Sequence, residues 1–187
     1  MTARGNRLCD RDVGRLESGQ EIGSDRFRGN GRRLGDWARG CVQTNGRDSR
    51  RIGQGAIHPF GDPAVVASQG TAGFELTREA ADLDAMVVPV GGGGLVCGIA
   101  ASLRRDNKGP RIIGVESRGA TALATGVEAG KPVTIEPSSV ADGLLAPFTT
   151  QLCIDLVASH EIELIDVGEP EIKDAMRGIY TRGKLGV

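Results

Sequence analysis

The stretch AMVVPVGGGGLVCGIAASL, residues 85–103, decides the fold of this 187-residue chain. Its first part, residues 85–90, is apolar without alternation, and this pattern predicts a strand that is buried on both faces. Four glycines follow, and the sequence from Leu95 to about Arg105 then predicts a helix. A strand that leads through a glycine loop into a helix is typical of a βαβ unit in a parallel sheet.

The four consecutive glycines, Gly91, Gly92, Gly93 and Gly94, carry the strongest chemical signal in the sequence. At the carboxyl end of a parallel strand, residues without Cβ let the backbone curl until successive N–H groups point at one spot. The helix that opens at Leu95 adds unpaired N–H donors and a partial positive charge. We therefore predict a phosphate-binding loop. The alternative is a glycine-rich turn that only allows close packing of helix and strand.

A dinucleotide-binding unit is a second alternative for this region. Glu116 ends the next predicted strand about 20 residues after the loop, where such folds place a ribose-binding carboxylate. The GxGxxG spacing would require a glycine at Val96 or Cys97, however, and the next glycine is Gly98. The glycine pattern therefore disfavours a dinucleotide.

The rest of the sequence after residue 56 alternates predicted helices and strands. Asp62 is a candidate N-cap, with Pro63 at the first helical position, for a helix to about Ala81 that could restart near Thr71. Strands are predicted at 111–116 and 161–167, and helices at 121–128, at 169–182 and from Thr149 or Thr150 to about Ser159. The predicted fold class is therefore α/β, a parallel sheet with flanking helices.

Residues 1–56 have a different composition from residues 57–187, and we predict two segments divided there. Every basic residue in 1–56 is arginine, glycines are scattered, and apolar residues show no sustained period. Such a stretch buries little surface, which predicts an irregular, poorly structured segment. Three interpretations stay open: a basic nucleic-acid arm, a solvated linker, and a frameshifted or deleted piece of gene, which we favour.

Composition and charge exclude several classes of protein. The net charge of −1 gives no argument for nucleic acid or for an anionic membrane. No apolar run approaches the roughly 18 residues of a membrane span. The cysteines Cys9, Cys41, Cys97 and Cys153 form no metal-ligand spacing, and a reduced, cytoplasmic setting fits them best.

Five motifs together resemble one branch of a known family. In order along the chain they are IHPFGDP at 57–63, ASQGT at 67–71, VPVGGGGL at 88–95, GVE at 114–116 and SVADG at 139–143. They are similar to the serine/threonine dehydratase and serine racemase branch of the fold-type-II pyridoxal-phosphate enzymes. The resemblance covers about two-thirds of the chain, which would be the large-domain portion of such an enzyme.

The resemblance implies a cofactor, a substrate and a set of binding residues. The cofactor would be pyridoxal 5'-phosphate, with its phosphate held by Gly91, Gly92, Gly93, Gly94 and the amide of Leu95. The reaction would be the deamination of L-threonine or L-serine to a 2-oxo acid and ammonia, by loss of water and hydrolysis of the enamine.

Some members also bind a divalent cation through a glutamate that matches Glu116 and a carbonyl that matches Ala120. Serine racemases have an aspartate where this chain has Ala122. A strand-end carboxylate in solvent or in a salt bridge is the alternative for Glu116.

The resemblance also shows what the chain lacks. The family's Schiff-base lysine lies in a Ser-Phe-Lys-x-Arg-Gly motif, and the most similar string here, residues 24–29, has Arg26 in its place. Arginine stays protonated and cannot supply a neutral amine. We therefore assign no catalytic residue and predict a truncated, impaired enzyme. A non-catalytic phosphate-ligand-binding remnant and a subunit that needs a partner are the alternatives.

The other candidate side chains are expected to have structural roles. We predict that His58 is a packed or capping residue. His160 is expected to lie exposed at a helix C-terminus, and Cys97 to pack between helix and sheet. All four lysines, Lys108, Lys131, Lys173 and Lys184, are expected on the surface. Because part of the family fold is missing, apolar surface should be exposed, and a homo-oligomer is possible.

Overall fold

The computed structural model describes residues 57–80, 82–103 and 109–186. The predictions for residues 1–56, including Arg26, and for Lys108 lie outside these described residues. Within them, no helix is long and apolar enough to cross a membrane.

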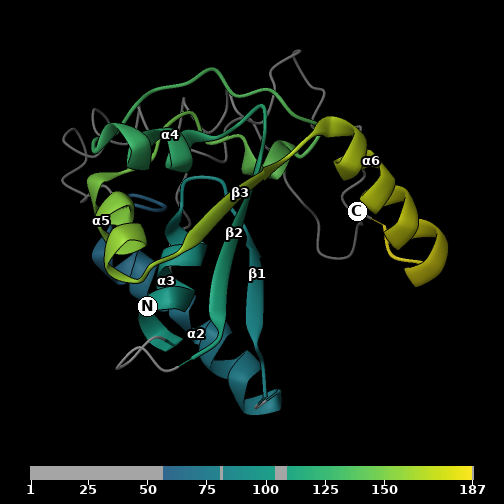
Figure 1. The fold of residues 1–187 in the computed structure, drawn as a ribbon, viewed down its shortest axis with the longest axis horizontal. Helices are drawn as coiled ribbons and strands as arrows, with labels where there is room; N and C mark the ends of the chain where they lie inside the picture. Colours follow the sequence, from purple (N-terminus) through teal and green to yellow (C-terminus); the bar gives the residue numbers. More distant parts are fainter. Residues whose placement is uncertain (1–56, 81, 104–108, 187) are drawn as a thin grey trace, which may run out of the picture.

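A parallel three-stranded sheet forms the centre of the fold, in the order β1-β2-β3 (Figure 1). The strands are β1 (Ala85–Pro89), β2 (Arg111–Ser117) and β3 (Glu163–Val167). Their register aligns Val87 with Ile113 and Ile113 with Glu163. The predicted α/β class and all three predicted strands are confirmed.

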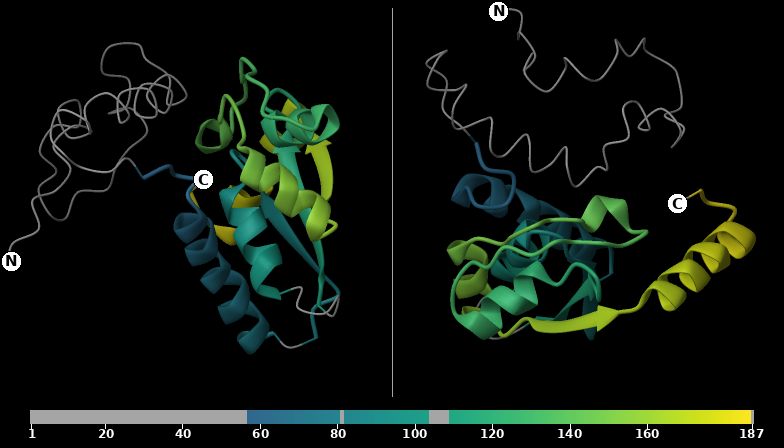
Figure 2. Two further views of the ribbon diagram at one scale, coloured as in Figure 1. Left: turned by 90° about the vertical axis from the view of Figure 1, so that its left-hand side faces the viewer. Right: turned by 90° about the horizontal axis from the view of Figure 1, so that it is seen from above.

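Helices alternate with these strands, as the sequence predicted. They are α2 (Pro63–Glu79), α3 (Gly94–Leu103), α4 (Ala122–Ala129), α5 (Gln151–Ser159) and α6 (Glu169–Gly178), with short turns η3 (Asp142–Leu144) and η4 (Ile179–Gly183). Figure 2 shows that α3 lies against the sheet and α2 packs outside α3. Helix α6 continues into the π-helical η4 and projects away from the sheet, and neither contains a buried residue.

The ends of α2 and α5 follow from their capping residues. Asp62 accepts a hydrogen bond from the amide of Ala64 at 2.8 Å, and Pro63 occupies the first position of α2. This helix is continuous and does not restart at Thr71. Of the two threonines proposed as the cap of α5, Thr150 has that role, since its hydroxyl accepts from the amide of Cys153.

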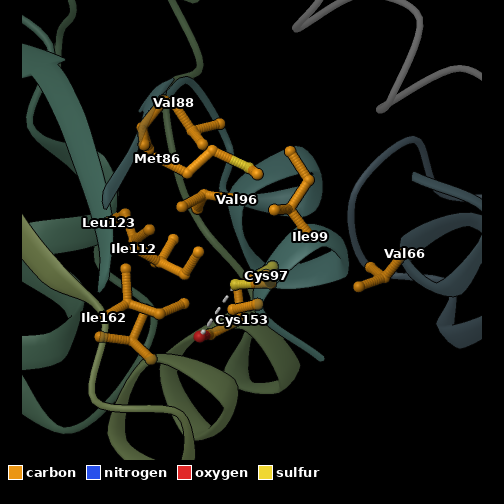
Figure 3. Close-up of a cluster of buried hydrophobic side chains, with 13 residues drawn as sticks. Val66, Met86, Val88, Val96, Cys97, Ile99, Ile112, Leu123, Cys153 and Ile162 are labelled. Atoms are coloured by element: carbon orange, nitrogen blue, oxygen red, sulfur yellow. Dashed lines mark hydrogen bonds between the residues drawn. The ribbon is translucent and has the colours of Figure 1, made fainter. Parts of the chain in front are cut away.

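The core lies between the sheet and helices α3 and α5. Figure 3 shows Val88, Val96, Ile112 and Leu123 packed together there, next to the two cysteines of the described residues. Helix α2 joins this core by a very close approach to α3. A Cβ placed on Gly98 would lie only 2.2 Å from the carbonyl oxygen of Val66. Gly98 therefore allows the two helix backbones to touch.

The prediction that β1 is buried on both faces was wrong. Val88 and Val90 are buried, but Val87 is 66% exposed. On the same face of the sheet, Ile165 in β3 is 43% exposed. The helices that contact the sheet cover its other face, so burial alternates along β1 although its sequence does not. The described residues thus present a partly apolar, exposed sheet face.

Candidate phosphate-binding site

The glycine loop joins the carboxyl end of β1 to the first residue of α3, as predicted. Gly93 has φ +100°, in the left-handed region that side chains disfavour, and Gly94 begins the helix. The amides from Gly91 to Leu95 donate no hydrogen bond to any other described residue. Gly93 and Gly94 are nevertheless buried. Buried N–H groups without partners are rare, and at a helix N-terminus they suit an anion that accepts several hydrogen bonds.

The space that a Cβ would occupy on Gly91 and Gly92 is already filled by other side chains and backbone. A Cβ on Gly92 would lie 2.5 Å from ring atoms of Phe60, and one on Gly91 would lie 3.3 Å from the carbonyl oxygen of Leu144. Thr149 is 1% exposed, and its hydroxyl donates to the carbonyl oxygen of Gly92 at 3.0 Å. The carbonyl groups of Gly92 and Gly93 are therefore engaged, by Thr149 and by the amide of Cys97, while the amides of the loop donate to no described residue.

Three of these supporting residues had no predicted role at the loop. Phe60 lies within the motif at 57–63, and Leu144 directly follows the motif at 139–143. Thr149 was considered only as a helix cap. Their order in the sequence contains no sign that they meet, because the contacts join segments far apart in the chain.

The motif at 139–143 is fixed by a carboxylate at the start of α6. Glu169 accepts hydrogen bonds from the hydroxyl of Ser139, from the amide of Val140 at 3.1 Å and from the hydroxyl of Ser117 at 3.5 Å. The hydrogen bonds from Ser139 and Val140 lower the pKa of Glu169. Glu169 thereby holds the segment that places Leu144 against Gly91.

Glu116 is buried, so its interpretation as a solvent-exposed or salt-bridged carboxylate was wrong. The side chain is 1% exposed, and its two oxygens accept from the amides of Leu123 and Ala124 at 2.9 and 3.0 Å. Thr121, directly before α4, makes no capping bond with its side chain. Glu116 therefore caps α4 from the end of β2. Burial raises its pKa, and the two backbone hydrogen bonds oppose this.

The residues expected at a divalent-cation site do not favour one here. Both oxygens of Glu116 are engaged by α4. Ala120 is buried, and Ala122, which replaces the aspartate of serine racemases, is fully buried at the start of that helix. The described residues contain no group of three or more His, Cys, Asp or Glu side chains that could hold a metal ion. A cation held by Glu116 and the Ala120 carbonyl stays a prediction.

The titration of Glu116 should make the free energy of unfolding of the wild type depend on pH. We expect the variant Glu116→Gln to lack this part of the pH dependence. Burial holds the folded-state pKa of Glu116 above the ordinary value of a glutamate, so folding favours the protonated form. Its contribution to stability is complete below the unfolded pKa and declines as the pH rises through the folded pKa. Urea unfolding at a series of pH values should therefore show the wild type losing its advantage over Glu116→Gln as the pH increases. A difference that is constant with pH would contradict this assignment.

His58 is packed as the sequence predicted, whereas His160 is less exposed than predicted. The Nδ1 atom of His58 accepts from the amide of Phe60, and the imidazole packs edge-on against Phe60 and Phe148. Burial lowers the pKa of His58. His160 ends α5 as its C-cap but is only partly exposed.

The remaining candidates also have surface or packing positions. Cys97 is fully buried in α3, so its predicted packing role is confirmed. Lys131, Lys173 and Lys184 are exposed. None of these three lysines belongs to the glycine loop or to the segments that support it.

Comparison with known proteins identifies the family. The family described as "Pyridoxal-phosphate dependent enzyme" matches residues 36–187. The chain belongs to this family. Among the relatives of this chain, the L-threonine ammonia-lyase of Thermotoga maritima is 32% identical over 140 residues, 74% of this chain and 35% of that protein. The phenylserine dehydratase of Ralstonia pickettii is 36% identical over 130 residues, 69% of this chain and 40% of that protein.

Solved structures of pyridoxal-phosphate dependent enzymes share the fold. Maize serine racemase matches with a TM-score of 0.71 and 32% identity, over 78% of this chain and 44% of that one. The predicted resemblance to the dehydratase and racemase branch is thus confirmed. The chain spans between about a third and a half of the length of these relatives.

Proposed function

We propose that residues 57–187 form the cofactor-phosphate-binding half of a pyridoxal-phosphate-dependent ammonia-lyase for L-threonine or L-serine. In this proposal, Gly91, Gly92, Gly93, Gly94 and the amide of Leu95 hold the phosphate of the cofactor. The observation that carries it is the set of loop amides that donate to no other described residue although Gly93 and Gly94 are buried. A phosphate would accept from these amides and also benefit from the positive end of α3.

The residues of the chain would bind and orient the cofactor. The amides fix the phosphate at the carboxyl edge of the sheet, and the left-handed Gly93 turns the backbone toward it. The Phe60 ring closes one side of the loop against water, while Thr149 keeps the Gly92 carbonyl pointed away from the anion. Glu169 holds the segment at 139–144 beside Gly91. Bound pyridoxal phosphate supplies the electron sink for eliminating water from the amino acid.

The lysine that would join the cofactor covalently has no counterpart among the described residues near this loop. This favours the second candidate function, a phosphate-ligand-binding module without catalysis. A third candidate is a subunit that obtains the lysine from a partner chain. All three share the phosphate loop, and they differ in whether a lysine of this chain reacts with the cofactor.

The test is titration of the full chain with pyridoxal phosphate, followed by borohydride reduction and peptide mass mapping. We expect saturable binding of pyridoxal phosphate and much weaker binding of pyridoxal, which lacks the phosphate. We expect no stoichiometric attachment to Lys131, Lys173 or Lys184, because all three are exposed and none belongs to the glycine loop. Equal affinity for the two compounds would refute the phosphate site. Stoichiometric attachment to one lysine would instead reject the non-catalytic alternative and justify assays with L-threonine and L-serine.

A further inference from the structure

We propose that Cys97 and Cys153 are an oxidative modification site, where two buried thiols join in a disulfide behind the phosphate loop. Both residues are fully buried, and they lie next to each other in the core (Figure 3). The Sγ atom of Cys97 donates to the carbonyl oxygen of Cys153 at 3.5 Å, so the Cys97 thiol reaches the backbone of Cys153 itself. The two cysteines come from different helices, so a bond between them would link α3 to α5.

The surroundings make the two thiols chemically different. Each cysteine lies in the first turn of its helix, where the positive end of the helix favours a thiolate. The neighbouring Cys97 thiol lowers the pKa of Cys153 to about 7, although burial opposes this. The neighbouring Cys153 thiol and burial raise the pKa of Cys97. Cys153 is therefore the nucleophile of the pair, and Cys97 is the thiol that completes the bond.

A small peroxide is the oxidant that suits a pair without surface exposure. The Cys153 thiolate attacks one peroxide oxygen, the O–O bond breaks, and the departing hydroxide takes a proton to become water. The sulfur of Cys97 then attacks the resulting sulfenic acid and expels hydroxide, which takes the Cys97 proton and leaves as a second water. Two thiols are oxidised to one disulfide, and one peroxide is reduced to two waters.

The disulfide would alter the contacts that Cys153 makes with Phe60 and beside Gly93 of the glycine loop. A disulfide requires the two sulfur atoms to lie about 2.05 Å apart, so both side chains must move. Cys153 now donates to the carbonyl oxygen of Phe60 at 3.2 Å, and its Sγ lies 3.3 Å from the position of a Cβ on Gly93. Oxidation removes that hydrogen bond and withdraws Cys153 from behind Gly93. We therefore infer that oxidation loosens the loop; a loss of cofactor affinity would follow only if the proposed function holds.

The site is tested by peroxide treatment of the full chain in which Cys9→Ser and Cys41→Ser remove the two other cysteines. After alkylation and digestion, mass mapping should find the peptides of Cys97 and Cys153 joined by a bond that dithiothreitol releases. The matched variant Cys97→Ser should give an oxidised Cys153 and no cross-link. Oxidation of Cys153 beyond sulfenic acid without a cross-link, or thiols that stay free until the protein unfolds, would overturn the site.

The effect on the loop is tested in the same samples. We expect amide hydrogen exchange at residues 91–97 to become faster by on the order of tenfold after cross-linking, and to recover with dithiothreitol. Pyridoxal phosphate should bind about tenfold more weakly to the oxidised chain, as expected for the loss of one hydrogen bond. If the reduced chain binds no pyridoxal phosphate, the proposed function fails, while mapping and exchange still decide the disulfide. A cross-link that leaves loop exchange unchanged would refute the coupling.

Discussion

Replacing Gly98 by alanine should destabilise the protein by about 3 kcal/mol, near the upper end of the range for overpacked sites. The added Cβ would lie 2.2 Å from the Val66 carbonyl oxygen, 2.9 Å from the Gln69 Cβ and 3.0 Å from the Gly70 amide nitrogen. All three of these neighbours belong to α2, and none is the flexible end of a side chain. Helices α2 and α3 would have to separate. Urea unfolding followed by circular dichroism measures the loss.

Gly178→Ala is the matched control, because Gly178 also lies in a helix but has no atom within 4 Å of the added Cβ. Alanine is the better helix former, so this variant should unfold with unchanged or slightly higher free energy. Equal stability of Gly98→Ala and the wild type would mean that α2 does not pack against α3 at this distance. Equal losses in both variants would point to a general effect of removing glycine.

Replacing Gly93 by alanine should weaken the binding of pyridoxal phosphate by between about 5-fold and 100-fold. Gly93 has φ +100°, and holding a residue with a side chain in such a region costs on the order of 1–3 kcal/mol. The new Cβ would also lie 3.1 Å from the Cβ of Cys153 and 3.2 Å from Leu123. The backbone can relieve both effects by rotating, which turns the amides away from the phosphate. Fluorescence titration with pyridoxal phosphate measures the change.

Gly130→Ala separates the loss of the phosphate site from the loss of stability. Gly130 has φ +65° at the end of α4, and nothing lies within 4 Å of an added Cβ. The variant should lose stability through backbone strain and keep its affinity for pyridoxal phosphate. If both variants lose affinity equally, the effect is on folding and Gly93 has no special role in binding.

The sequence predicted the elements of this fold well because each has a local signal. Asp62-Pro63 begins α2, and the apolar run at 85–90 marks β1. The four glycines predicted the loop between β1 and α3 for a similar reason, since their effect on the backbone does not depend on distant residues. The burial of β1 was predicted wrongly because the number of layers on a sheet depends on tertiary contacts that periodicity does not contain.

The supporting residues of the site could not be predicted from local pattern. Thr149 contacts Gly92 across 57 positions of sequence, and Ser139 reaches Glu169 across 30. Glu116 was identified as a residue of interest from its place at a strand end. Its capping of α4 depends on how β2 and α4 meet in space, which the sequence around it does not specify. Long-range hydrogen bonds of this kind require the folded chain.

The parallel arrangement of the sheet has a consequence for the order in which the protein folds. Neighbouring parallel strands must wait for the chain between them to form a crossover, and the entropy of closing that loop grows with its length. Helix α3 lies in the connection from β1 to β2, and Val87 of β1 and its partner Ile113 of β2 are 26 residues apart, whereas Arg111 of β2 and its ion-pair partner Glu163 of β3 are 52 residues apart. We therefore expect the α2–β1–α3–β2 unit to assemble first. The third strand would dock late, after the glycine loop at 91–94 has already taken shape.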